Sequence, residues 1–247
     1  MTVRIQMIGT GSAFAKKYYN NNALVYGTNF NLLIDCGVTA PRSLHDLQFP
    51  LDRLDGILIT HQHADHIGGL EEIALRLCYS YGRKRIKLFL PEALEKPLWN
   101  HSLRGGLENV VEGFHGLSDY FDVVLMKENV NTPIADNLTI ELIRTDHIQQ
   151  KFSCSLIIND LLFYTADIVF TPALLKRIVE ERGCKYIFHD CQLSSPGIVH
   201  AALSELLTLP EELQERITLM HYGDDMDLNA ETGRMKFAVQ HCLYELV

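Results

Sequence analysis

The segment 60–69, THQHADHIGG, restricts the fold of this chain more than any other part of the sequence. It holds three histidines and an aspartate within six residues, and it overlaps the end of the short apolar run 56–60, GILIT. A short continuous apolar run is typical of a strand that is buried on both faces. Imidazole and carboxylate groups are preferred ligands of Zn²⁺ and similar divalent metals. We therefore expect a buried strand that ends in a metal-binding turn.

The spacing within this segment indicates more than one ion. His61 and His63 are two positions apart, so on an extended backbone their side chains project in the same direction. Asp65 and His66 lie on the following turn and can face a neighbouring point. Four such groups are more than one tetrahedral ion takes from a single loop. We expect two adjacent ions with further ligands from other segments; the alternative is a polar loop of exposed histidines.

The rest of the chain alternates between short apolar runs and helical patterns, which predicts an α/β fold. Asn159-Asp160 indicates a tight hairpin. Strands with helices on both outer faces predict a layered α/β/β/α sandwich in a single domain, 1–247. The expected strands are 3–8, 22–26, 30–34, 56–60, 87–90, 123–125, 138–144, 153–158, 161–164, 186–189 and 217–220, and the expected helices are 68–79, 171–183, 199–208, 210–214 and 230–243.

The charge balance excludes some partners. The chain has 22 Lys and Arg against 31 Asp and Glu, a net charge of −9. So acidic a chain has little general affinity for nucleic acid or for an anionic membrane, and no apolar run approaches the ~20 residues of a membrane span. The six cysteines form no C-x-x-C pair and indicate reduced thiols. We expect a cytoplasmic protein in a reducing compartment, with no membrane and no stable nucleic-acid partner.

The pattern H-x-H-x-D-H after a buried strand resembles the metallo-β-lactamase superfamily. Four further segments resemble the superfamily pattern in the same chain order: LLIDCG at 32–37, TDH at 145–147, YTAD at 164–167 and LMH at 219–221. This resemblance spans about residues 3–222 and implies a four-layer αβ/βα sandwich of two mixed sheets flanked by helices. It implies two divalent ions, Zn²⁺ or else Mn²⁺, with His61, His63 and His147 on one ion, Asp65, His66 and His221 on the other, Asp167 on both, and Asp35 orienting the ligands from behind.

Other segments resemble the tRNase Z-like phosphodiesterase branch of that superfamily: GTGSAF at 9–14, NNN at 20–22, IFHDC at 187–191 and VHA at 199–201. In that branch a carboxylate orients a histidine that serves the leaving oxygen. The matching residues here are Asp190 and His200, although the branch usually has Glu at the first position. The resemblance implies Asp65, Asp190 and His200 as catalytic residues. The turn at Gly11 and Ser12 can bring backbone N–H groups to an anion, so we expect Ser12 and the nearby Asn21 to contact substrate; the alternative is a tight turn without a ligand.

The distance between two ligand segments favours a small substrate. Asp167 follows His147 by 20 positions, which the expected hairpin 153–164 fills, so the long tRNA-gripping arm of tRNase Z has no place. Chain size and motifs resemble the phage-type anti-Pycsar proteins. That resemblance implies hydrolysis of 3′,5′-cyclic nucleotides (cCMP, cUMP, cAMP, cGMP) to nucleoside monophosphates, in a homodimer whose subunits help to close each other's pockets. It also implies that the activity counters Pycsar antiphage signalling in the cytoplasm of a phage-infected or bacterial host. The candidate closing loop is 99–122, where His115 and Tyr120 are expected to contact substrate; a lid or dimer surface without ligand contact is the equal alternative.

Three other functions remain open at this stage. They are a tRNase Z-like RNA endonuclease, a phosphodiesterase for another small cyclic phosphate, and a protein that binds the nucleotide without turnover.

Overall fold

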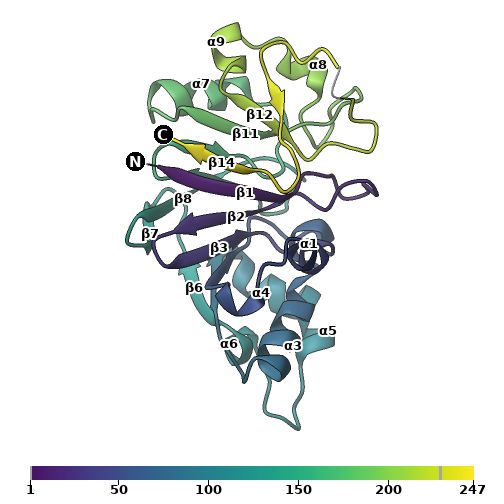
Figure 1. Ribbon diagram of the computed structural model, residues 1–247, viewed down its shortest axis with the longest axis vertical. Helices are drawn as coiled ribbons and strands as arrows, with labels where there is room; N and C mark the ends of the chain where they lie inside the picture. The colour runs from purple at the N-terminus through teal and green to yellow at the C-terminus, as the bar shows by residue number, and fades with distance from the viewer. Residues whose placement is uncertain (1, 228–229) are drawn as a thin grey trace.

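Two seven-stranded sheets pack face to face, and helices cover both outer faces (Figure 1). The computed structural model describes residues 2–227 and 230–247. The four layers confirm the αβ/βα sandwich expected from the sequence. The two chain ends lie side by side, because the first and last strands pair with each other.

Each sheet mixes parallel and antiparallel pairs. The first sheet has the order β14 (Leu243–Leu246), β1 (Val3–Gly9), β2 (Asn22–Gly27), β3 (Phe30–Ile34), β4 (Gly56–Leu58), β5 (Lys87–Pro91), β6 (Asp122–Met126). In this order, the neighbouring pairs from β14 to β3 are antiparallel and those from β3 to β6 are parallel.

The second sheet has the order β13 (Lys236–Phe237), β12 (Ile217–Met220), β11 (Tyr186–Asp190), β10 (Leu162–Tyr164), β9 (Cys154–Ile158), β8 (Leu138–Arg144), β7 (Thr132–Ala135). Its neighbouring pairs from β13 to β10 are parallel and those from β10 to β7 are antiparallel.

The helices divide between the two sheets in chain order. Most of those from the first half cover the first sheet, and those from the second half cover the second (Figure 1). The first group is α1 (Ala40–Asp46), η1 (Leu51–Arg53), α2 (Ala64–Ile67), α3 (Leu70–Ser80), η2 (Glu92–Leu94), α4 (Glu95–Leu98), the π-helix η3 (Trp99–Leu103), α5 (Arg104–Leu107) and α6 (Leu117–Tyr120). The second group is α7 (Pro172–Glu180), α8 (Leu203–Leu206) and α9 (Glu211–Gln214).

Alternation along the strands builds three apolar cores. On β10, Leu162 and Tyr164 point into the core between the sheets, whereas Phe163 points outward under the helices of the second sheet. This is the period of two that a strand imposes on its side chains. Because central strands are apolar on both faces, they hold their carboxyl ends at fixed positions, and those ends carry the polar residues described below.

The expected strands are all present, with ends shifted by no more than two residues. The hairpin at Asn159-Asp160 is also confirmed, since both residues have positive φ (54° and 51°), as a type I′ turn requires. The sequence did not indicate the edge strand β7 or the helix α1.

Two helix predictions were wrong. Residues 230–243 form no helix; the segment contains β13 and reaches the start of β14. Positive φ at Gly233 (62°) and His241 (67°) interrupts a helix, and pairing with β12 and β1 overrides the apolar spacing. The helix expected over 199–208 is reduced to α8, because residues before it are extended: Ala201 N–H donates to Ile168 O and Gln192 N–H to Ala201 O.

Candidate metal centre

The polar residues of interest converge because the strands that carry them run in the same direction. β8, β10, β11 and β12 share one orientation, so their carboxyl ends meet at one edge of the second sheet. His147, Asp167 and His221 follow three of these strands, and Asp190 is the last residue of β11. The turn 61–66 follows β4 and faces them from the first sheet. Asp167 therefore lies between donors from both sheets.

Three groups of possible metal donors share Asp167, and two of them, with seven side chains in all, match the ligand sets expected from the sequence; the third comprises Asp167, Asp190, His200 and His221. The first donor group comprises His61, His63, His147 and Asp167, and the second comprises Asp65, His66, His221 and Asp167. In the first, His63 Nδ1 lies 3.0 Å from His61 Nε2 and 3.3 Å from His147 Nε2, and Asp167 Oδ2 lies 3.6 Å from both of those Nε2 atoms. In the second, His66 Nε2 lies 3.2 Å from Asp65 Oδ2 and 3.1 Å from Asp167 Oδ1, and His221 Nε2 lies 3.3 Å and 3.5 Å from the same two oxygens.

These separations fit divalent ions. Ligand atoms about 2.0–2.1 Å from a tetrahedral Zn²⁺ lie about 3.3–3.4 Å from one another. Two of the atoms, His66 Nε2 and Asp167 Oδ1, are buried and make no hydrogen bond, although they are 3.1 Å apart. Buried polar atoms are normally satisfied. A cation in the second group would satisfy both atoms, and the donor spacing of the first group fits another ion, so the residues present fit a pair of divalent ions.

Hydrogen bonds behind the donor atoms fix the ring orientations. His147 Nδ1–H donates to Val199 O (2.7 Å) and His66 Nδ1–H donates to Asp35 Oδ2 (2.8 Å). His61 Nδ1–H donates to Thr60 Oγ1 (3.1 Å), whose own hydrogen goes to Asp35 Oδ2 (2.8 Å). In each case the hydrogen bond fixes Nδ1–H and turns Nε2 toward the donor group, where Nε2 can bind a metal once it carries no proton.

Asp35 and two other residues shape the backbone of the metal-binding turn. Asp35 Oδ1 accepts the N–H of Thr60 (2.8 Å), and Asp35 itself has a φ of 58°. A Cβ on Gly37 would lie 1.9 Å from the carbonyl oxygen of Asp65, so only glycine allows this approach. Asn22 accepts from Gly37 N–H (2.9 Å) and donates to Asp65 O (3.3 Å). The segment NNN at 20–22 did not indicate that Asn22 is the asparagine whose side chain makes these two hydrogen bonds.

Asp190 links two histidines at one end of the centre. Its Oδ2 accepts from His200 Nδ1–H (2.7 Å) and from the N–H of Ile168 (3.0 Å), and its Oδ1 lies 3.3 Å from His221 Nδ1. One carboxylate therefore orients both a member of the second donor group and a histidine outside the two groups. His200 keeps Nε2 as the ring nitrogen that is available for proton transfer.

The two donor groups differ in the direction of their pKa shifts. Burial lowers the pKa of His61, His63 and His147. Burial also opposes a charge on His66 and His221, yet nearby carboxylates, Asp167 first, raise the pKa of both well above the ordinary value. His200 behaves like the second pair, because Asp190 raises its pKa in spite of burial.

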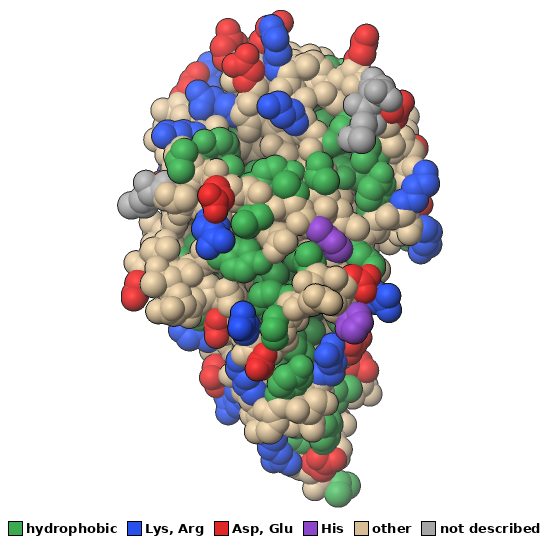
Figure 2. Space-filling view, viewed as in Figure 1, with side chains coloured by type: hydrophobic (Ala, Val, Ile, Leu, Met, Phe, Trp, Pro, Cys, Tyr) green, Lys and Arg blue, Asp and Glu red, His purple; other side chains and the backbone are tan. Residues whose placement is uncertain are grey.

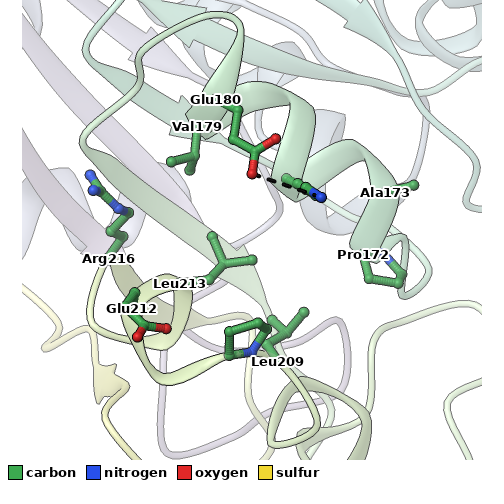
Figure 3. A pocket seen from close by; sticks show the side chains of 10 residues that line it. Pro172, Ala173, Val179, Glu180, Leu209, Glu212, Leu213 and Arg216 are labelled. Carbon is green, nitrogen blue, oxygen red and sulfur yellow. Dashed lines mark ion pairs between the residues drawn. The ribbon is translucent and has the colours of Figure 1, made fainter.

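Two cavities flank the first donor group. The turn cavity, about 610 Å³, is lined by Phe14, Asp65, Asp167 and His200 among others. The basic cavity, about 590 Å³, is lined by His101, Arg144 and Lys151 among others, and no Asp or Glu is among the described residues that line it. His63 and His147 belong to both walls. The cavity drawn in Figure 3 lies elsewhere, between α7 and α9, and is lined by none of the donor residues.

Ser12 and Asn21, which were expected to contact substrate, are each hydrogen-bonded to another segment of the protein. Ser12 is half-buried, and its N–H donates to Tyr222 O (3.0 Å), directly after His221. Asn21 is buried and donates to Tyr164 Oη (3.2 Å), while its Oδ1 has no partner. Neither lines the turn cavity, although Ala13 and Asn20 beside them do.

The segment 99–122 is folded into core rather than left as an open loop. Tyr120 is buried, stacks on Phe114 and donates its hydroxyl to Leu107 O (2.6 Å), so its aromatic ring serves packing. His115 is exposed, and neither residue lines the turn cavity or the basic cavity. The sequence could not separate these roles, because an aromatic residue that packs in the core and one that stacks on a base are the same residue type.

The face of the molecule shown in Figure 2 has no broad basic patch. On the side shown in Figure 2, Lys and Arg are interspersed with Asp and Glu rather than gathered in one patch. In the part of the chain that the structure describes, no helix has the length and apolar composition needed to cross a bilayer.

The sandwich and its clustered histidines and aspartates define a protein of the metallo-β-lactamase fold with a candidate divalent-metal centre. The fold matches the metallo-β-lactamase fold protein YhfI from Bacillus subtilis with a TM-score of 0.77 at 16% identity, covering 99% of this chain and 100% of that one. It matches the short form of human tRNase Z with a TM-score of 0.67 at 16% identity, covering 98% of each chain.

The chain belongs to the anti-Pycsar protein Apyc1 family, whose model matches residues 3–244. An anti-Pycsar protein Apyc1 from Paenibacillus xerothermodurans is 59% identical over 99% of this chain and 98% of its own length. One from Bacillus phage BSP38 is 46% identical over 99% of both chains. The resemblance drawn from the motifs is thereby confirmed.

Proposed function

We propose that this protein is a metal-dependent phosphodiesterase that hydrolyses 3′,5′-cyclic nucleotides to nucleoside monophosphates and so counters Pycsar antiphage signalling. One observation carries the proposal: members of both donor groups line the same cavity as His200, and the buried Asp190 holds His200 Nδ1 at 2.7 Å. A nucleophile-activating centre and a proton donor on one cavity are what hydrolysis of a phosphodiester needs. The anti-Pycsar names of the relatives support this choice of substrate.

The reaction adds water across one P–O bond of the cyclic phosphodiester. Two ions, when bound by the donor groups, would lower the pKa of water and neutralise the phosphoryl oxygens. We propose Zn²⁺, because five of the seven donor side chains are imidazoles, with Mn²⁺ as the alternative. The departing ribose oxygen needs a proton, and His200 supplies it from Nε2 while Asp190 holds Nδ1. Asp65, buried at the wall of the turn cavity, orients the attacking water.

The shape of the protein disfavours an RNA substrate. The strands β9 and β10 are joined by a tight turn, so the connection between His147 and Asp167 is a compact hairpin. A net charge of −9 also opposes binding of a polyanion such as RNA.

We propose a homodimer as the active form. We also propose a reducing cytoplasm as the location of the protein, and the six free cysteines support this location.

The proposal is tested by incubating the metal-loaded protein with cyclic CMP and cyclic AMP, followed by chromatography. Linear nucleoside monophosphate supports the proposal. Recovery of unchanged nucleotide, bound in stoichiometric amount, would identify a binding protein instead. Cleavage of precursor tRNA without turnover of either cyclic nucleotide would identify an RNA endonuclease. Light scattering on the same sample tests the dimer.

A further inference from the structure

An exposed aromatic residue, Phe14, lines the turn cavity. Phe14 is 87% exposed, although it is large and apolar. It lines the same cavity as Asp167 and His200, and Val38, which also lines that cavity, is 60% exposed. Apolar side chains gathered at the mouth of a cavity mark a ligand contact more often than isolated ones do.

The turn that bears Phe14 is held at a fixed place relative to the metal centre. A Cβ on Gly11 would lie 2.7 Å from the Cβ of Tyr18, so the turn closes only on glycine. On the far side, the carboxylate of Asp224 accepts the N–H groups of Lys16 (2.9 Å) and Lys17 (2.8 Å). Asp224 follows His221 by three positions, so the ring and the second donor group are joined through a short length of backbone.

The side-chain oxygens of Asn20 and Thr39 on the same wall are engaged with each other. Asn20 Oδ1 accepts from both the N–H (3.1 Å) and the hydroxyl (2.9 Å) of Thr39, and Thr39 Oγ1 accepts from Asn20 N–H (2.7 Å). Asn20 Nδ2 lies 3.5 Å from Ser12 O, and Lys16 also lines the cavity. For a planar ligand, this wall therefore offers the face of the Phe14 ring beside few free acceptors.

We propose that Phe14 is the platform on which the nucleobase of the substrate stacks, and that Asp224 is the residue that positions it. The inference rests on the proposed function and adds a role for the rim of the cavity. A scissile phosphate at the donor groups leaves the sugar and base to extend toward the mouth, where Phe14 stands. Every base has a π-face, so stacking needs no free hydrogen-bonding group on this wall.

The test compares Phe14→Ala, Phe14→Trp and the matched surface variant Leu125→Ala, a 42% exposed residue on edge strand β6. The substrates are cyclic AMP and a base-free methyl riboside 3′,5′-cyclic phosphate. Loss of one stacking face should raise the KM for cyclic AMP about five- to thirtyfold in Phe14→Ala, with kcat within about twofold. Phe14→Trp should restore KM, Leu125→Ala should not change it, and the base-free substrate should not distinguish any of the proteins.

The proposal is overturned if Phe14→Ala leaves the KM for cyclic AMP unchanged, or raises it equally for the base-free substrate. It is also overturned if the KM rises only together with dissociation of the oligomer in light scattering, since Phe14 would then serve a subunit contact. If the wild-type protein hydrolyses neither substrate, the proposed function fails separately. Calorimetric binding of a non-hydrolysable cyclic adenosine phosphorothioate then decides the role of Phe14 by the same comparison.

A double-mutant cycle tests the positioning role of Asp224. Asp224→Asn should raise the KM for cyclic AMP less than Phe14→Ala does, with kcat unchanged. In the Phe14→Ala background it should add nothing, because the ring that it positions is gone. Additive effects, or an equal effect on the base-free substrate, would contradict positioning through Phe14.

Discussion

The two donor groups share Asp167 but are supported in opposite ways. In the first group, neutral acceptors stand behind two histidines: the hydroxyl of Thr60 and the carbonyl of Val199. In the second group, carboxylates stand behind both histidines: Asp35 behind His66 and Asp190 behind His221. The comparison teaches that similar ligand types can be prepared for a cation by two different means.

The two groups also differ in charge, chiefly because of burial in the first and of nearby carboxylates, Asp167 first, in the second. Burial lowers the pKa of the first group's histidines, which are therefore neutral and ready to bind a cation near pH 7. The raised pKa of His66 and of His221 keeps protons on the second group, where they balance several buried carboxylates. An ion entering the second group must displace those protons, whereas an ion entering the first does not.

Loss of the shared residue should have the largest effect. Asp167→Ala removes an oxygen from both groups, so metal content should fall from two ions per chain to less than one, and turnover by at least about a thousandfold. Metal analysis and the chromatographic assay on one sample measure both. Two retained ions with full activity would refute the shared role.

Variants confined to one group should separate the two sites. His66→Ala should abolish turnover and remove the ion of the second group, and it also leaves Asp35 without its charged partner. His63→Ala should remove the first ion and leave the second in place, because His63 is the less buried ligand and supports no carboxylate. Metal stoichiometry of the two variants tests this, and equal loss of both ions in both variants would show that the groups do not bind independently.

His200→Ala should slow turnover without removing metal. General acid catalysis contributes about 10²–10⁴-fold, so kcat should fall within that range while both ions remain. A loss of metal would instead make His200 a ligand, and an unchanged kcat would remove it from the mechanism.

Asp35→Asn tests support from behind the second group. Residues that orient a metal ligand typically contribute about 10–100-fold to metal affinity or activity. The amide keeps the size of the side chain but loses the charge opposite His66. We expect metal affinity to fall within that range in a chelator competition, with Leu125→Ala as the control that should not change it.

The smallest expected effect is the difference in pH dependence. For the second group, the raised pKa values mean that metal binding releases protons at neutral pH, so affinity should increase as the pH rises from 7. For the first group, the lowered pKa values mean that affinity should change little over the same range. Calorimetric titration of metal-free protein in buffers of different ionisation enthalpy measures the protons released at each step. Equal proton release for the two ions would contradict the comparison.

Much of this arrangement could be predicted from the sequence, because strands and ligand motifs are local features. The strand before the turn 61–66 is an uninterrupted apolar run, and His147, Asp167 and His221 each follow a predicted strand. The hairpin residues Asn159 and Asp160 carry their own turn preference. Such signals need no knowledge of what packs against them.

The parts that could not be predicted depend on partners distant in the chain. The apolar spacing of 230–243 fits a helix, and only pairing with β12 and β1 makes it extended. Val199 gives its carbonyl to a histidine 52 residues away, which no local pattern announces. Tyr120 is an aromatic residue of the kind that can stack on a base, but it is buried in the core beneath the first sheet.

The proposed function depends most on whether each of the two donor groups binds an ion, with Asp167 shared between them. The most direct measurement is metal analysis combined with X-ray absorption on the protein purified without chelator. We expect two ions per chain with nitrogen and oxygen ligands and a metal–metal distance of about 3.5–4 Å, and we expect Asp167→Ala to reduce the content to less than one ion per chain. A protein that retains no ion when supplied with Zn²⁺ or Mn²⁺, or that retains two ions unaffected by Asp167→Ala, would contradict the account.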